Sequence, residues 1–195
     1  ETFSDYERPE SIDILIVVDD SGDVEDLQSA LAEALPDFLD PLVEQGMNIE
    51  LAVATTSRSG ELGLAPPGKS GPGCQLNSNR IANSTQDNWT KVAACNVQQG
   101  SDGDSFQQAL SVTADLFAMG SGDLGFFRPR SKRVVLVVTN EDDCSHEGEL
   151  SERGRQACLA SLSSLTSVKL MTDELAAFPS SPEGLVFGVI SGPPE

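Results

Sequence analysis

The sequence has few positive charges and no long apolar run. Twelve lysine and arginine residues stand against thirty-one aspartate and glutamate residues, which gives a formal net charge of -19. A chain of this charge repels phosphate backbones, so nucleic acid is excluded as a partner and cations or basic proteins are favoured. No apolar run approaches the roughly 20 residues of a membrane-spanning helix. We therefore expect no transmembrane segment in this chain, and any lipid anchor would lie outside it.

Several catalytic and metal-binding patterns are also missing. The single histidine, His146, lies beside Cys144, and two such ligands leave a tetrahedral zinc site half empty, so we interpret His146 as a solvated loop residue. No nucleophile elbow follows a predicted strand, which removes the usual serine hydrolase arrangement. An aspartyl-phosphate hydrolase built on Asp19 needs a second aspartate two residues later, and Ser21 occupies that position. The sequence therefore predicts a protein that is not an enzyme, with an Asp19-dependent hydrolase as the least favoured alternative.

Four cysteines are present, and none belongs to a CxxC pair. Because the number is even, two disulfides are the simplest interpretation, and they predict a secreted, cell-surface or periplasmic location. Cys74 and Cys95 both fall in 57–103, a long segment rich in glycine, proline, serine and asparagine, where we expect a disulfide between them. Four buried, reduced thiols in a cytosolic protein are the alternative.

Length and hydrophobic pattern predict one α/β domain over residues 1–195. Buried β-branched runs alternate with segments of helical period, which indicates a doubly wound, mainly parallel sheet flanked by helices. The helix after the first strand is expected to be interrupted or kinked near Pro36 and Pro41. The expected strands are 12–18, 49–54, a short edge strand at 91–94, 134–138 and 185–190; the expected helices are 24–42, 105–120, 150–165 and 171–178.

Acidic loops follow two of the predicted buried strands. The first strand ends in Asp19-Asp20-Ser21-Gly22-Asp23, the strand 134–138 ends in Asn140-Glu141-Asp142-Asp143-Cys144, and a third polar loop, Gly100 to Asp104, precedes a helix. Ligands of open α/β sheets bind at the carboxyl ends of the strands. Oxygens at alternate positions of a tight turn suit hard divalent cations. These loops are therefore the main functional signal in the sequence.

The order of these loops resembles the von Willebrand factor A (vWA) domain. VVDDSGD is similar to the DxSxS motif of its metal-ion-dependent adhesion site, Gly103 to Leu110 is similar to the second motif loop, and Thr139-Asn140-Glu141 falls on the third. VVLVVTNEDDCS and VFGVISGPP resemble a subgroup found in secreted or lipid-anchored proteins of gliding and predatory Gram-negative bacteria. The resemblance spans residues 11–194 and implies a vWA, Rossmann-like fold, with a disulfide between Cys144 and Cys158.

The resemblance implies a metal site with an altered ligand set: Asp19, Ser21, Asp23, Asp104 and Asn140. Relative to the family motif, Asp23 replaces a serine, Asp104 replaces a threonine and Asn140 replaces an aspartate. The additional carboxylates favour calcium over magnesium, because calcium accepts more oxygen ligands in a looser geometry. The alternative is a degenerate site without metal, in which loop amides and helix N-termini hold the acids.

The function implied by the resemblance is protein binding at an extracellular or cell surface, including the outer membrane. The expected contact rim consists of Asp20, Ser57, Asp102 and Asp142. At its centre, the metal would bind an acidic group of a protein ligand. That ligand is expected to be another surface or envelope protein. A structural or assembly domain with a degenerate site is the alternative. The chain ends soon after the fifth expected strand, where the family adds a helix and a strand, so we expect a trimmed domain or missing residues.

A basic cluster precedes the strand 134–138. Arg128, Arg130, Lys132 and Arg133 make up a third of all lysine and arginine residues. Such a cluster can dock an acidic partner or a lipid headgroup, but a solvated loop that offsets the surrounding negative charge is the favoured interpretation.

Overall fold

The computed structural model describes residues 11–58, 62–104, 106–146, 155–177 and 184–191. Five strands form one sheet in the order β3-β2-β1-β4-β5. The elements along the chain are β1 (Ser11–Val18), α1 (Glu25–Glu44), β2 (Asn48–Thr55), β3 (Ile81–Asn83), α2 (Trp89–Asn96), α3 (Ala109–Leu124), β4 (Lys132–Thr139), α4 (Arg155–Ala160), the 3-10 turn η1 (Leu162–Ser164), α5 (Val168–Ala177) and β5 (Leu185–Ser191).

The sheet is mixed. β2, β1, β4 and β5 run parallel, whereas β3 pairs antiparallel with β2. β3 is reached from β2 through an irregular segment and not through a helical crossover, so β2 and β3 do not form a βαβ unit. The prediction of a doubly wound sheet of the vWA type is corrected accordingly. Periodicity cannot reveal a three-residue strand inside a polar segment, which is why β3 was missed.

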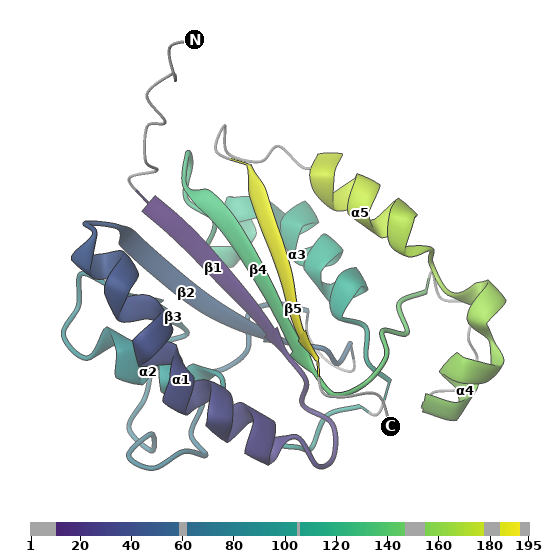
Figure 1. Cartoon of the computed structure of the whole chain (residues 1–195), viewed down its shortest axis with the longest axis horizontal. Coiled ribbons are helices and arrows are strands. Elements are labelled where there is room, and N and C mark those ends of the chain that lie inside the picture. Colours follow the sequence, from purple (N-terminus) through teal and green to yellow (C-terminus); the bar gives the residue numbers. More distant parts are fainter. Residues whose placement is uncertain (1–10, 59–61, 105, 147–154, 178–183, 192–195) are drawn as a thin grey trace, which may run out of the picture.

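Helices cover both faces of the sheet, with α1 and α2 on one side and α3 and α5 on the other (Figure 1). Successive residues of β1 alternate between two cores: Ile14 and Ile16 pack on the α1 side, and Leu15 and Val17 on the α3 side. Each of these side chains is at most 1% exposed. A strand buried on both faces explains the continuous apolar run in the sequence.

Two local predictions differ from the structure. The segment expected as an edge strand at 91–94 lies inside α2, where Trp89 and Ala93 are buried one helical turn apart. The interruption expected near Pro36 and Pro41 does not occur, since α1 continues from Glu25 to Glu44 with both prolines inside it. Leu35 and Leu39, four residues apart, are nearly fully buried on the face of α1 that packs on the sheet. This burial keeps the helix in place although each proline lacks a backbone donor.

Both disulfides are present. Cys74 is bonded to Cys95 across 21 residues, and Cys144 is bonded to Cys158 across 14. The first cross-links the irregular segment to α2, and the second links the loop after β4 to α4. These bonds place the chain in an oxidising environment, as for a secreted or cell-surface protein. Within the described ranges, no helix has the length and apolar character to cross a membrane.

A charged cluster lies at the amino end of β1. Asp13 is fully buried, and its carboxylate accepts hydrogen bonds from the backbone N–H of Arg128 at 2.5 Å and from Arg128 Nε at 2.7 Å. The hydroxyl of Ser131 donates to the same carboxylate. Arg128 also donates to Asn48 Oδ1 at 2.7 Å. The interpretation of Arg128 as a solvated residue is therefore wrong, since it neutralises a buried acid.

Arg133 belongs to the same basic run and is also drawn inward. Its guanidinium lies 5.1 Å from the ring centroid of Phe127 and 5.5 Å from that of Phe117. Burial lowers the pKa of Arg133, and the negative charge of Asp13 opposes that shift. Two of the four basic residues, Arg128 and Arg133, therefore have structural roles at the amino end of the sheet.

Candidate functional site

Four chain segments meet at the carboxyl ends of β1, β2 and β4, and we call this region the loop face: residues 19–24, 56–58, 100–108 and 139–145. The segment 100–108 is bonded to the other three. Gly103 N–H donates to the Asp20 carbonyl at 2.7 Å, and Gln108 N–H donates to the Thr56 carbonyl at 3.1 Å. Cys144 N–H donates to the Gln107 carbonyl at 2.7 Å. Segments far apart in sequence are thus fixed to one another by their backbones.

Asp19 is the buried acid of the loop face. It is fully buried, and its two carboxylate oxygens accept hydrogen bonds from Ser21 N–H at 2.9 Å and from the Thr139 hydroxyl at 2.6 Å. Gln28, at the first turn of α1, donates to the Asp19 carbonyl at 2.8 Å. Among the described residues, the groups that bind this carboxylate are therefore neutral. Thr139 and Gln28 were missed in the sequence because a strand-terminal threonine and a helical glutamine carry no motif.

Ser21 has an unsatisfied hydroxyl. The residue is 2% exposed, and its Oγ is buried without a hydrogen-bond partner in the part of the chain that the structure describes. A buried hydroxyl without a partner costs free energy, about 1 to 3 kcal/mol, unless a further group completes it. A cation or a water molecule at Ser21 Oγ would remove that cost.

Asp20 faces the segment 100–108. Its Oδ1 accepts a hydrogen bond from the Ser57 hydroxyl at 2.8 Å, and Ser57 Oγ in turn accepts one from Asp104 N–H at 2.6 Å. Burial raises the pKa of Asp20, while its hydrogen bond to Ser57 lowers it. Gly103 packs closely against this carboxylate, because a Cβ at that position would lie 2.3 Å from Asp20 Cγ. Asp20, Ser57 and Gly103 form one packed contact.

A second hydrogen-bonded pair joins the segment 56–58, after β2, to the segment 100–108. The hydroxyl of Thr56 donates to Gln107 Oε1, and Gln107 Nε2 donates to the Asp104 carbonyl at 2.7 Å. Thr56 and Gln107 are both buried. Neither was identified from the sequence, because their roles depend on contacts between distant segments.

The structure brings together only part of the predicted metal-ligand set. Asp19 and Ser21 are neighbours through the bond described above, and the backbone of Asp104 is tied to Ser57. Asp23 is exposed in a left-handed conformation, with a φ of 65°, and Asn140 is exposed after β4. Among the described residues, no group of three or more histidine, cysteine, aspartate or glutamate side chains is placed to hold a metal ion.

These residues fit a divalent cation only in part. The unpartnered Ser21 Oγ is suited to it, but both Asp19 oxygens already accept hydrogen bonds. A calcium ion needs six to eight oxygens, so backbone carbonyls or water would have to complete a site at Asp19 and Ser21. The five-residue set predicted from the sequence is not assembled as one cluster of carboxylates.

The predicted contact rim divides into two kinds of residue. Asp102 and Asp142 are exposed, as a contact surface requires. Asp20 and Ser57 are partly buried and bonded to each other, so they shape the loop face from within. Asp23 is a further exposed acid of this face.

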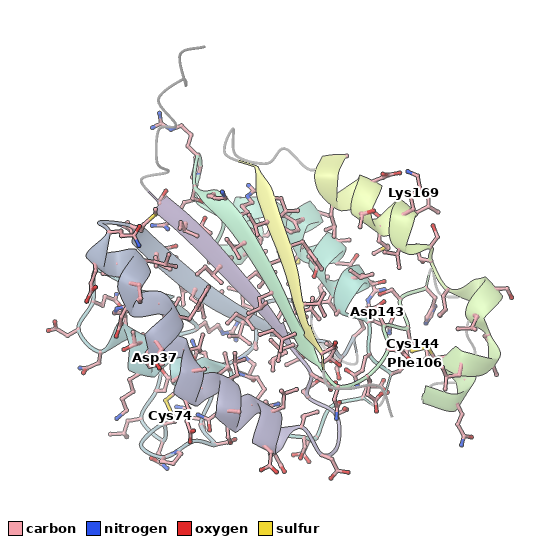
Figure 2. All side chains as sticks on the ribbon, viewed as in Figure 1. Asp37, Cys74, Phe106, Asp143, Cys144 and Lys169 are labelled. Carbon is pink, nitrogen blue, oxygen red and sulfur yellow. A yellow bond between two sulfur atoms is a disulfide. The ribbon has the colours of Figure 1, made fainter. Side chains whose placement is uncertain are left out.

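The Cys144–Cys158 disulfide supports one side of the loop face. Phe106, Cys144 and Cys158 form a small buried cluster, and Phe106 and Cys144 lie next to each other in Figure 2. The ring of His146 packs edge-on against Phe106, with 5.2 Å between the ring centroids. Asp143, labelled beside them, accepts hydrogen bonds from Leu110 N–H at 3.0 Å and Ser145 N–H at 2.9 Å. The described part of the loop after β4 is therefore bonded to the start of α3 through Asp143 and to α4 through Cys144.

Comparison with known proteins gave distant structural likenesses only. No family model matches the chain, and no curated protein matches it. The pilus adhesin SpaC from Lactobacillus rhamnosus GG is 16% identical in its open conformation, with a TM-score of 0.44 over 71% of this chain. The adhesive tip pilin GBS104 from Group B Streptococcus agalactiae is 9% identical, with a TM-score of 0.39 over 73%.

This chain spans 16% of the length of SpaC and 49% of that of GBS104. The assignment to the vWA family is corrected by these findings. No family model supports it, and the sheet is mixed.

Proposed function

We propose that the chain is a non-catalytic protein-binding module that contacts its partner through the loop face. The observation that carries this proposal is the backbone bonding of the segment 100–108 to three other loops at one edge of the sheet. Surface loops held rigidly on a scaffold are the usual location of binding residues. The exposed acids Asp23, Asp102 and Asp142 give this surface negative charge, which suits a basic partner.

Adhesion at a cell surface is the finer form of this proposal. The two disulfides support a location outside the cytosol, whether secreted, at the cell surface, or in the periplasm beside the outer membrane. An assembly domain whose loops only stabilise the fold is the second candidate, because neutral donors already satisfy the carboxylate of Asp19.

A divalent cation, with calcium favoured over magnesium, is a further part of the proposal. The supporting observation is the buried, unpartnered Ser21 Oγ beside the buried carboxylate of Asp19. When bound, the cation would supply positive charge at the loop face and an open coordination position for an acidic group. Asp19 and Ser21 are the residues that would hold it.

The test of the loop face compares two variants of equal charge. Asp23→Asn with Asp102→Asn removes two exposed acids from the loop face, and asparagine tolerates the left-handed backbone at residue 23. Asp37→Asn with Asp40→Asn removes two exposed acids from α1, and Figure 2 shows Asp37 on α1, away from Asp143. Beads coated with each protein are applied to an array of immobilised secreted and cell-surface proteins.

On each array protein that the wild type binds, the loop-face variant should bind about tenfold more weakly. The α1 variant should bind as strongly as the wild type. Equal losses in both variants would show that net charge alone controls adhesion, and would favour the assembly role.

A further inference from the structure

The two disulfides belong to different parts of the molecule. Cys74–Cys95 joins the irregular segment before β3 to α2. Cys144–Cys158 joins the segment 139–145, which is part of the loop face, to α4. Both bonds are buried, since each of the four cysteines is at most 3% exposed. Formation of the Cys144–Cys158 bond therefore acts directly on the loop face, and formation of the other bond does not.

Cys144 is also tied to a second segment of the loop face. Its backbone N–H donates to the Gln107 carbonyl at 2.7 Å, within the segment 100–108. Gln107 itself is buried, and its side-chain Nε2 donates to the Asp104 carbonyl at 2.7 Å. The disulfide thus holds Cys144 from one side, and the backbone of Cys144 holds the segment 100–108 on the other. Whatever fixes the position of Cys144 also fixes this segment.

Phe106 couples the segment 100–108 to the disulfide through its side chain. It is 1% exposed and packs with Cys144 and Cys158 in a small cluster that is separate from the two cores of the sheet. Figure 2 shows Phe106 and Cys144 next to each other. Cys158 reaches this cluster from α4. If the two cysteines are reduced, α4 is no longer covalently bonded to the loop face, and Phe106 loses part of its apolar cover.

The neighbours of Cys144 hold the start of α3. Asp143 Oδ2 accepts a hydrogen bond from Leu110 N–H at 3.0 Å, and Ser145 Oγ accepts one from Ser111 N–H at 2.9 Å. These amides belong to the first turn of α3, where backbone donors have no partner within the helix. The rest of α3 packs on the sheet in a core that contains neither cysteine. A shift of Cys144 would therefore disturb the loop that leads into α3 and leave the sheet in place.

We propose that oxidation of Cys144 and Cys158 is the switch that orders the loop face. In the reduced chain the sheet and its two cores form, whereas the segments 100–108 and 139–145 open locally and lose their mutual bonds. The inference rests on the proposed binding role and adds its regulation. A chain in a reducing compartment does not bind its partner, and the same chain binds after it reaches an oxidising one.

Thiol–disulfide exchange forms the bond, and the oxidant is a disulfide of the thiol–disulfide oxidoreductase class. The thiolate of one cysteine attacks a sulfur of this donor and forms a mixed disulfide. The thiolate of the other cysteine then attacks the sulfur of the first. The donor leaves as a dithiol, so two electrons pass to it. The two protons lost by Cys144 and Cys158 balance those on the two new thiols of the donor.

Two double variants test the switch. Cys144→Ser with Cys158→Ser, the loop-face disulfide variant, removes the bond at the loop face. Cys74→Ser with Cys95→Ser, the control variant, removes the other bond. Hydrogen exchange measured by NMR follows each backbone amide separately. In a further measurement the wild type is reduced with dithiothreitol and then reoxidised, so that the same switch is followed without a substitution.

The amides that tie the loop face together report on its order. Gly103 N–H donates to Asp20, and Gln108 N–H donates to Thr56. Both amides should exchange about tenfold or more faster in the loop-face disulfide variant and in the reduced wild type, while the amides of β1 keep their rates. Reoxidation should restore slow exchange, and the control variant should retain it. Unchanged rates at Gly103 and Gln108, or an equal rise in β1, would overturn the proposal.

Phe106 tests the route from the disulfide to the segment 100–108. Phe106→Ala keeps both disulfides, which a thiol assay checks, and should raise exchange at Gly103 about as much as removal of the bond does. Phe106→Leu should keep slow exchange, because leucine still fills most of the apolar cluster. Slow exchange in Phe106→Ala would contradict the coupling and with it the proposal.

The adhesion array separates this inference from the proposed function. The loop-face disulfide variant should bind about tenfold more weakly than the wild type, and the control variant should bind as strongly as the wild type. Faster exchange at Gly103 without weaker adhesion would support the switch and refute the loop-face binding role. Weaker adhesion with unchanged exchange would refute the switch alone.

Discussion

The two ends of β1 each bury an aspartate, and the protein treats them differently. Asp13 and Asp19 are both fully buried. Asp13 is paired with the guanidinium of Arg128 at 2.7 Å, so its charge is neutralised within the chain. Asp19 accepts hydrogen bonds from a backbone amide and a threonine hydroxyl, both of them neutral. The buried acid at the amino end of the sheet is paired with a cation, whereas the described groups that bind the Asp19 carboxylate at the other end are neutral.

This difference separates a structural cluster from the proposed binding surface. A buried charge paired with an opposite charge and further hydrogen bonds needs nothing from outside. At the loop face, Ser21 Oγ has no partner among the described residues, Asp20 has a raised pKa, and Asp23 and Asp102 are exposed. Additional positive charge, from a cation or a basic protein, would therefore stabilise the loop face at the carboxyl end of the sheet and not the cluster at its amino end.

The largest expected effect concerns Asp13 at the amino end of the sheet. Asp13→Asn should reduce the free energy of unfolding by about 3 kcal/mol, because it removes the charge that pairs with Arg128. Arg128 is 25% exposed, so water offsets part of the loss. The matched change at the other end, Asp19→Asn, should cost about 1 kcal/mol, since only neutral donors are disturbed. Urea unfolding measures both, and a larger loss for Asp19→Asn would contradict the comparison.

Calcium should stabilise the protein through the loop face alone. If Asp19 and Ser21 hold calcium, a concentration one hundred times the dissociation constant should stabilise the fold by about 2.7 kcal/mol. Thermal melting with calcium and then with a chelator measures the gain. Asp19→Ala should abolish it, while Asp37→Ala on α1 should keep it. A wild-type melting temperature that is the same with calcium and with chelator would favour the assembly role over the metal site.

The smallest effect concerns the pH dependence of stability at Asp20. Burial raises the pKa of Asp20 in the folded state above the ordinary value of 3.8. At pH values between the pKa of Asp20 in the unfolded chain and its higher pKa in the folded state, the folded state binds more protons than the unfolded state. The free energy of unfolding therefore falls as the pH rises through this range. Asp20→Asn keeps the acceptor for Ser57 and should lack this part of the fall. Chemical unfolding at a series of mildly acidic pH values measures it, and identical slopes would contradict the assignment.

The sequence predicted the buried strands well because their signal is local. The runs at 12–18 and 134–138 are apolar throughout, and both became strands covered on two faces. The helix expected to stop at Gly120 does lose its helical geometry there, where φ is 69°. β3 and α2 were predicted incorrectly, because short elements in a polar segment owe their form to packing against β2 and α1.

The sequence placed the candidate site in the acidic loops after the buried strands, and the structure brings only part of the predicted residues together. Asp19 and Ser21 are neighbours at the carboxyl edge of the sheet. Asp23 and Asn140 are instead exposed. Thr139, Gln28 and Gln107 took roles that no motif announces. The difference arises because a side chain's direction within a loop depends on its tertiary partners.

By itself, the amino-acid sequence determined the four long strands, the helices of regular period, the strong negative charge and the even set of cysteines. These properties follow from short-range periodicity and from composition, which folding does not alter. Only the tertiary structure decided that Arg128 neutralises Asp13 and that Ser21 Oγ has no hydrogen-bond partner among the described residues. Each of these depends on segments distant in sequence meeting in space, where burial and pairing set the free energy of a charge or a hydrogen-bonding group.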